Sequence, residues 1–390
     1  MICVIYGVPM LTGCRLVPGV VVSELGLPTA GTAFLLYEAW LPLLAENHWE
    51  VRDMAPGPER ADKVVTLIDR ISNYGFIYGF AGGLSCLIIC FPFVLYSSSI
   101  FGDEATGIRV AVVIAGVWWF TIQFYTFANL KTRPGPPLPE GTRSYFVYSW
   151  GRFFDTMGRV PKMPTTMRYM ILWFFYSDGV NTIANTAVLA MGVMIRWCYV
   201  SKSVALLAML AGLPIFSVVG LYIASWIMKK WGVSAKSVVF SALLIVSLIP
   251  IYGLIGFWTD DWGLHYGFEV VIIACVFGLC FGVVVAYSRS IMAQLIPPGY
   301  EAQFFSIFEI TNRGSSWLGP VVVSQVYKQT GELRYAFIYI LATTLIPALL
   351  LGMLDIEDGR KRAQEYAQQH PVIRDTLVPE KKKITKNTYL

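Results

Sequence analysis

Long apolar stretches, each close to the length that crosses a membrane, recur along this chain and constrain its fold more than any other feature. A transmembrane helix needs about 20 mostly apolar residues to span the roughly 30 Å hydrocarbon layer. Unbroken runs of this length exclude the strands of an outer-membrane barrel, whose polarity alternates over about 10 residues. The sequence therefore predicts an all-α polytopic membrane protein with about nine transmembrane helices, near 29–45, 75–98, 107–129, 168–192, 203–228, 237–258, 268–288, 304–328 and 335–354.

The composition excludes several other classes of protein. Of the 390 residues, 56% are hydrophobic and 14% are charged, whereas a soluble domain has about 25% charged residues. The net charge of +5 is too small to suggest a nucleic-acid partner, so the expected surroundings are a lipid bilayer. Three scattered histidines do not suggest a metal or haem site. Because the chain also lacks the P-loop and the nucleophile-elbow motifs, we expect no enzymatic activity, no catalytic residue, no cofactor and no metal.

The basic residues predict the orientation of the chain in the membrane. Most of the 30 Lys and Arg residues fall in the 46–74 and 130–168 loops and in the tail after residue 355. Loops rich in Lys and Arg stay on the cytosolic side, so these loops and the C-terminus are expected in the cytosol. The sequence contains no N-x-[ST] glycosylation site, which suits an internal membrane better than a cell surface.

A long Pro/Gly-rich connection divides the chain. It begins KTRPGPPLPEG and separates three predicted spans from six. Six spans followed by a cytosolic tail are typical of one half of a two-half transporter. The predicted organisation comprises an unmatched N-terminal segment (1–28), a three-span remnant of an N-terminal half (29–130), a cytosolic central loop (131–167), a six-helix half (168–355) and a basic cytosolic tail (356–390) that begins as a short surface helix.

Ionisable and amide side chains inside the spans are the candidate functional residues, because a charge at the bilayer centre costs about 2.5–3.5 kcal/mol. Asp178, Asn181 and Asn185 fall on one face of the fourth span. Glu309, Asn312 and Arg313 lie in the eighth span, where Glu309 and Arg313 are spaced to form an ion pair. Glu38 lies in the first span. Each of these residues either forms a structural contact between helices or lines a water-filled pathway for substrate and protons.

The stretches PPGYEAQFF (297–305) and NRGSSWLGP (312–320) form a distinctive combination near the end of the chain. This combination resembles the autophagy-related protein 22 family, the fungal vacuolar amino-acid effluxers of the major facilitator superfamily. Stretches 72–83 and 174–182 resemble the same family, and 34–44 does so more loosely, with Glu38 where an amide is expected. The resemblance covers about residues 30–355. The residues that carry it most specifically are Pro298, Gly299, Glu301, Phe304, Phe305, Ser315, Ser316, Trp317, Gly319 and Pro320.

The resemblance implies a major-facilitator-like helical bundle with about nine of an expected twelve transmembrane helices present, and a chain shortened at its N-terminus. It also implies a vacuole-membrane protein that releases leucine and similar amino acids to the cytosol after autophagic breakdown. The superfamily's cytosolic G-x-x-x-D-[RK]-x-G-[RK]-[RK] turn is degraded in this chain, where 228–236 contains no Asp.

Three functions remain open from the sequence. The first is a carrier that binds amino acids between two helical halves and takes protons as a second partner, with the substrate carboxylate on Arg313. The second is a non-transporting or inactive membrane protein, or a partner subunit of another protein. The third is a major-facilitator carrier for another small solute. The oligomeric state is not predicted.

Overall fold

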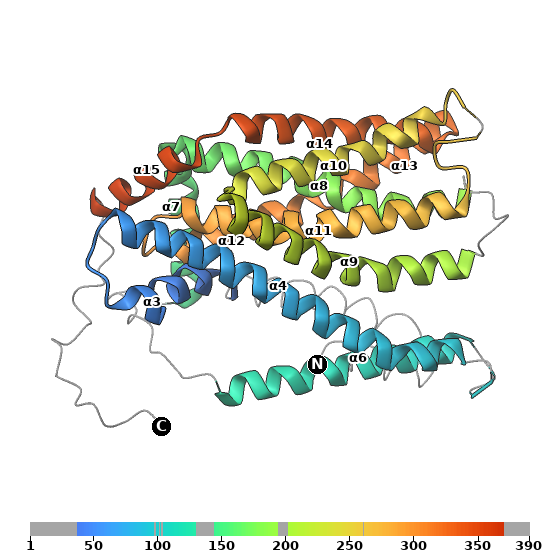
Figure 1. Cartoon of the computed structure of the whole chain (residues 1–390), viewed down its shortest axis with the longest axis horizontal. Coiled ribbons are helices and arrows are strands. Elements are labelled where there is room, and N and C mark those ends of the chain that lie inside the picture. The colour runs from blue at the N-terminus through green and yellow to red at the C-terminus, as the bar shows by residue number, and fades with distance from the viewer. Residues whose placement is uncertain are drawn as a thin grey trace.

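The structure is a computed structural model, shown in Figure 1, and it describes residues 37–96, 99–100, 102, 104–129, 144–193, 202–259 and 261–369. All of the longer regular elements in these ranges are helices, as the sequence predicts. The segment 1–28, the central loop up to residue 143 and the tail after residue 369 lie outside the described residues.

The N-terminal part of the described chain is more helical than the sequence suggests. Residues 37–46 form a helix, followed by α3 (Trp49–Arg52), α4 (Pro58–Leu95) and α6 (Glu104–Asn129). Helix α4 has 38 residues, which corresponds to about 57 Å at 1.5 Å per residue. It is therefore longer than the hydrocarbon layer is thick, and much of the predicted 46–74 loop is helix.

The C-terminal part forms a tight bundle built from α8 (Pro164–Val193), α9 (Lys202–Trp231), α10 (Ala235–Ile255), α11 (Gly267–Leu295) and α14 (Ala336–Met353). Figure 1 shows these helices side by side, with α4 along one flank and α6 beyond it. Helices α9 and α11 pack closest, because Ser217 donates a hydrogen bond to the Gly278 carbonyl at 3.0 Å and Gly220 lies against the Leu279 backbone. Small residues permit this approach.

The predicted eighth span is two helices rather than one. Helix α12 (Glu301–Ser315) ends before Ser316 and Trp317, and α13 (Leu318–Thr330) begins after them. Side chains at the end of α12 bond to its own carbonyls: Ser315 donates to Asn312 O at 2.9 Å and Ser316 to Arg313 O at 2.8 Å. Such bonds compete with the backbone pattern of a helix. The predicted span 304–328 is therefore divided into two helices at Ser316 and Trp317, two residues that keep right-handed helical backbone angles.

The other predicted spans coincide with helices wherever residues are described. Helix α8 has the length to cross a membrane but carries the polar candidate residues, and the first span is described only from residue 37. Among the described residues, six helices are long and apolar enough to cross a membrane, namely those over Pro58–Leu95, Arg109–Thr126, Ala211–Trp231, Ala235–Ile255, Gly267–Leu295 and Leu333–Met353.

Two amphipathic helices lie at the predicted cytosolic end. Helix α7 (Tyr145–Arg159), inside the predicted central loop, exposes Val147, Trp150 and Phe154 on one face. The 3-10 helix η1 (Val160–Lys162) joins it to α8. Helix α15 (Ile356–Gln369) confirms the predicted short helix at the start of the tail, and its Gly359 lies against α8 and α11.

Candidate functional site

Asp178 lies in the bundle between three helices. Its side chain is buried, and both carboxylate oxygens are occupied. Oδ1 accepts a hydrogen bond from the backbone N–H of Gly319 at 3.0 Å, and Oδ2 accepts one from the Tyr339 hydroxyl at 2.6 Å. Asp178 therefore joins α8 to the N-terminal end of α13 and to α14, where a carboxylate is favoured by the free N–H groups of a helix start.

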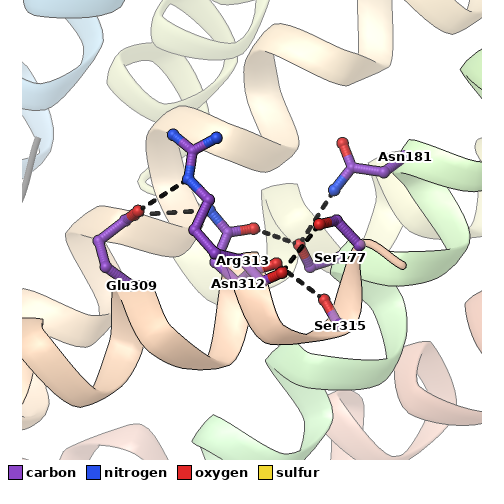
Figure 2. A network of polar contacts seen from close by, with 7 residues as sticks. Ser177, Asn181, Glu309, Asn312, Arg313 and Ser315 are labelled. Carbon is purple, nitrogen blue, oxygen red and sulfur yellow. Dashed lines mark hydrogen bonds and ion pairs between the residues drawn. The ribbon is translucent and has the colours of Figure 1, made fainter. Parts of the chain in front are cut away.

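A second set of polar contacts joins α8 to α12, as Figure 2 shows. Ser177 donates a hydrogen bond to Asn312 Oδ1 at 2.6 Å, and Asn181 Nδ2 lies 3.5 Å from Ser177 Oγ. The predicted residues Asn181 and Asn312 are thus brought together through Ser177. Asn185, predicted to share this face, is exposed on α8 and lies outside the network.

Glu309 and Arg313 form the ion pair that their spacing predicts, with Arg313 Nε 3.5 Å from Glu309 Oε2. The two side chains differ in their surroundings: the Glu309 side chain is 8% exposed and the Arg313 side chain is 55% exposed. Asn312 Nδ2 lies 3.5 Å from the other oxygen, Glu309 Oε1. Two polar contacts on α12, from Asn312 and from Arg313, therefore meet at the Glu309 carboxylate (Figure 2).

Glu38, at the start of the described chain, reaches the same region. Its side chain is buried and contacts Glu309, with the guanidinium groups of Arg289 and Arg313 within electrostatic range. Arg289 is buried in α11, and its guanidinium lies over the Tyr37 ring, 4.4 Å from the centroid. Sequence reasoning missed Arg289 because it counts as a basic residue close to the cytosolic end of the predicted span 268–288. The Lys and Arg pattern used for topology treats such residues as loop charges.

The residues that carry the family resemblance have mainly structural contacts. Gly299 adopts a φ of 94°, and its N–H donates to Glu301 Oε1 at 2.8 Å at the start of α12. Phe304 and Phe305 are fully buried in the core. A Cβ atom at Gly319 would collide with Thr182 of α8. Trp317, at the break between α12 and α13, is exposed.

The described residues contain no group of three or more His, Cys, Asp and Glu side chains that could hold a metal ion. An apolar cavity of about 60 Å³ lies between α8, α9, α10, α11 and α14. None of the predicted polar residues lines this cavity, whose walls include Ile183, Leu213, Phe277 and Phe337.

Comparison with known proteins agrees with this architecture. A sequence profile described as "Vacuole effluxer Atg22 like" matches residues 2–364. The match includes residues 2–28, which the resemblance noted above did not cover. Autophagy-related protein 22-1 of Aspergillus niger is 29% identical over 321 residues, which are 80% of this chain and 51% of that protein. Autophagy-related protein 22 of Gibberella zeae is 30% identical over 355 residues, 87% of this chain and 52% of that protein. The chain thus spans about half the length of these relatives.

Solved structures share the fold at low sequence identity. A crystal structure of the E. coli fucose:proton symporter FucP has a TM-score of 0.57 at 10% identity and covers 91% of this chain and 82% of that one. A second structure, described as the major facilitator superfamily transporter FucP in the outward conformation, has a TM-score of 0.54. The chain has the helical architecture of that superfamily, and it belongs to the family of Atg22-like vacuole effluxers.

Proposed function

We propose that this chain carries amino acids, leucine and similar ones, across the vacuole membrane from the lumen to the cytosol. The family membership and the shared helical architecture support a membrane transporter. The concentration of Lys and Arg on one side supports a cytosolic C-terminus. The amino-acid substrate and the direction rest on the resemblance to vacuolar effluxers.

One structural observation carries the proposal: a partly buried network of polar side chains lies beside the break between α12 and α13. Transporters bind substrates near discontinuous helices, whose free backbone groups and nearby side chains replace water around the solute. Here the break follows Ser315, and Asn181, Glu309, Asn312 and Arg313 surround the stretch before it. Asn185 lies one turn further along α8. Asp178 holds the second half of the broken helix, and the buried carboxyls of Glu38 and Glu309 are candidates for accepting protons from an acidic lumen.

The test is transport by the purified chain in proteoliposomes. Vesicles loaded with unlabelled L-leucine and placed in labelled L-leucine should accumulate label by exchange, whereas protein-free vesicles should not. Unlabelled glucose should not compete, because the proposal is specific to amino acids. Exchange no faster than in protein-free vesicles would contradict the proposal and favour a non-transporting membrane protein.

A further inference from the structure

Buried polar atoms without hydrogen-bond partners concentrate in one region of the molecule. In the described part of the chain there are six such side-chain atoms, and four of them belong to Glu38, Asn73, Arg289 and Glu309. Glu309 Oε2 does lie 3.5 Å from Arg313 Nε, but as an ion pair without a hydrogen bond. A buried polar atom that forms no hydrogen bond costs about 1–3 kcal/mol, so four of them together require an explanation.

Contacts of the neighbouring aromatic rings place these residues at one junction. The Arg289 guanidinium lies 4.4 Å from the Tyr37 ring centroid and 5.9 Å from that of Phe76. Glu38 follows Tyr37 and contacts Glu309. Asn73 precedes Phe76 by three residues, so both lie on the same face of α4. The junction is therefore formed by the 37–46 helix, α4, α11 and α12.

The charges at this junction, and its polar atoms without hydrogen bonds, indicate which kind of ligand would bind there. When Glu38 and Glu309 are both ionised, the guanidinium groups of Arg289 and Arg313 balance their two negative charges. The atoms that form no hydrogen bond are three acceptors, Glu38 Oε2, Asn73 Oδ1 and Glu309 Oε2, and one donor, Arg289 Nε. A purely cationic or anionic ligand would add net charge to a buried site, which is costly. A neutral molecule with a compact ammonium and a carboxylate satisfies both kinds of atom.

We infer that Glu38, Asn73, Arg289 and Glu309 bind the α-ammonium and α-carboxylate groups of the transported amino acid. The inference rests on the proposed function and assigns its substrate site. The ammonium lies between the two carboxylates, whose mutual repulsion it relieves, and its third donor bonds to Asn73. The substrate carboxylate bonds to Arg289, which the Tyr37 and Phe76 rings hold in place by cation–π contact. Arg313 serves as the ion partner of Glu309.

The first experiment measures equilibrium binding to the purified full chain in lipid nanodiscs. Three probes have the same apolar side chain: L-leucine with both charged groups, L-leucinamide with the ammonium only, and 4-methylpentanoate with the carboxylate only. The parent chain should bind L-leucine at least tenfold more tightly than either of the other probes. Equal affinity for L-leucine and one of these probes would overturn the inference.

Two charge-removing variants test which residue binds the substrate carboxylate and which binds the substrate ammonium. Arg289→Gln should weaken L-leucine binding at least tenfold and leave L-leucinamide binding unchanged. Glu38→Gln should weaken L-leucine binding similarly and leave 4-methylpentanoate binding unchanged. The matched controls are Arg362→Gln and Glu357→Gln, two exposed side chains of α15, and both variants should bind L-leucine like the parent. Parent-like binding by both Arg289→Gln and Glu38→Gln would overturn the inference.

A measurement on the parent chain covers the case in which these variants do not fold. A hydrophobic carbodiimide labels carboxyl groups in apolar surroundings, and mass spectrometry of the peptides locates the label. L-Leucine should protect Glu38 and Glu309 from labelling, while any labelling of Asp178, whose oxygens are already bonded, should not change. Lack of protection in a chain that binds L-leucine overturns the site and leaves the proposed function standing. A chain that neither binds nor transports amino acids overturns both.

Discussion

Asp178 and Gly319 are 141 positions apart in sequence, yet the Asp178 carboxylate accepts the Gly319 backbone N–H at 3.0 Å. Gly319 is the second residue of α13, the second half of the broken helix. The same carboxylate accepts the Tyr339 hydroxyl at 2.6 Å. One buried side chain on α8 therefore sets the position at which α13 begins, and with it the geometry of the break beside Glu309 and Asn312.

Replacing Asp178 should destabilise the protein more than replacing its hydroxyl partner. Asp178→Ala leaves the buried Gly319 N–H and the partly buried Tyr339 hydroxyl without acceptors, so the free energy of unfolding should fall by about 2–3 kcal/mol. Tyr339→Phe removes one hydrogen bond and should cost about 1 kcal/mol. Thermal unfolding of the two variants in the same detergent compares them. Equal losses would show that the bond to Gly319 contributes nothing.

The two glycines near the break should respond oppositely to alanine. A Cβ at Gly319 would collide with Thr182, so Gly319→Ala should separate α13 from α8 and destabilise by about 1–3 kcal/mol. A Cβ at Gly314 would meet no atom within 4 Å. Gly314→Ala should therefore be neutral or stabilise by up to about 1 kcal/mol through helix propensity. A stable Gly319→Ala variant would contradict the close contact of α8 and α13.

The close packing of α9 on α11 can be tested with a similar pair of glycine-to-alanine variants. A Cβ at Gly220 would overlap the Leu279 backbone, whereas a Cβ at Gly212 would lie 3.7 Å from Phe216, an ordinary contact distance. We expect Gly220→Ala to lower the melting temperature and the yield of folded protein, and Gly212→Ala to leave both unchanged. Size-exclusion profiles with thermal unfolding provide the comparison. If both variants behave alike, α9 and α11 do not meet at Gly220.

The ion pair on α12 should affect transport unequally through its two members. Glu309 is buried and Arg313 is about half exposed, and exposed ion pairs contribute about 0–1 kcal/mol. Glu309→Gln should therefore slow leucine exchange at least tenfold, and Arg313→Gln less than threefold. A double-mutant cycle on the exchange rate separates the two residues. Equal losses that do not add in the double variant would assign the pair to structure alone.

Hydropathy predicted the existence of most helices, because a length of apolar sequence is a local property. The spacing of four residues on one helix also predicted the Glu309–Arg313 ion pair, which is likewise a local property. The break after Ser315 was missed because Gly314, Ser315 and Ser316 are compatible with a continuous helix. What favours the break is the bond from Gly319 to Asp178, a contact between distant segments. The role of Arg289 was missed for the same reason, since only packing against Tyr37 and Phe76 distinguishes it from a loop arginine.

Release of labelled L-leucine from isolated vacuoles tests the central claim most directly. Vacuoles would be prepared from host cells that lack this chain and from the same cells expressing it, and loaded equally with label. The account predicts faster release when the chain is present, and a return to the slower rate with Arg289→Gln at equal amounts of protein in the membrane. Release at the same rate with and without the parent chain would contradict it.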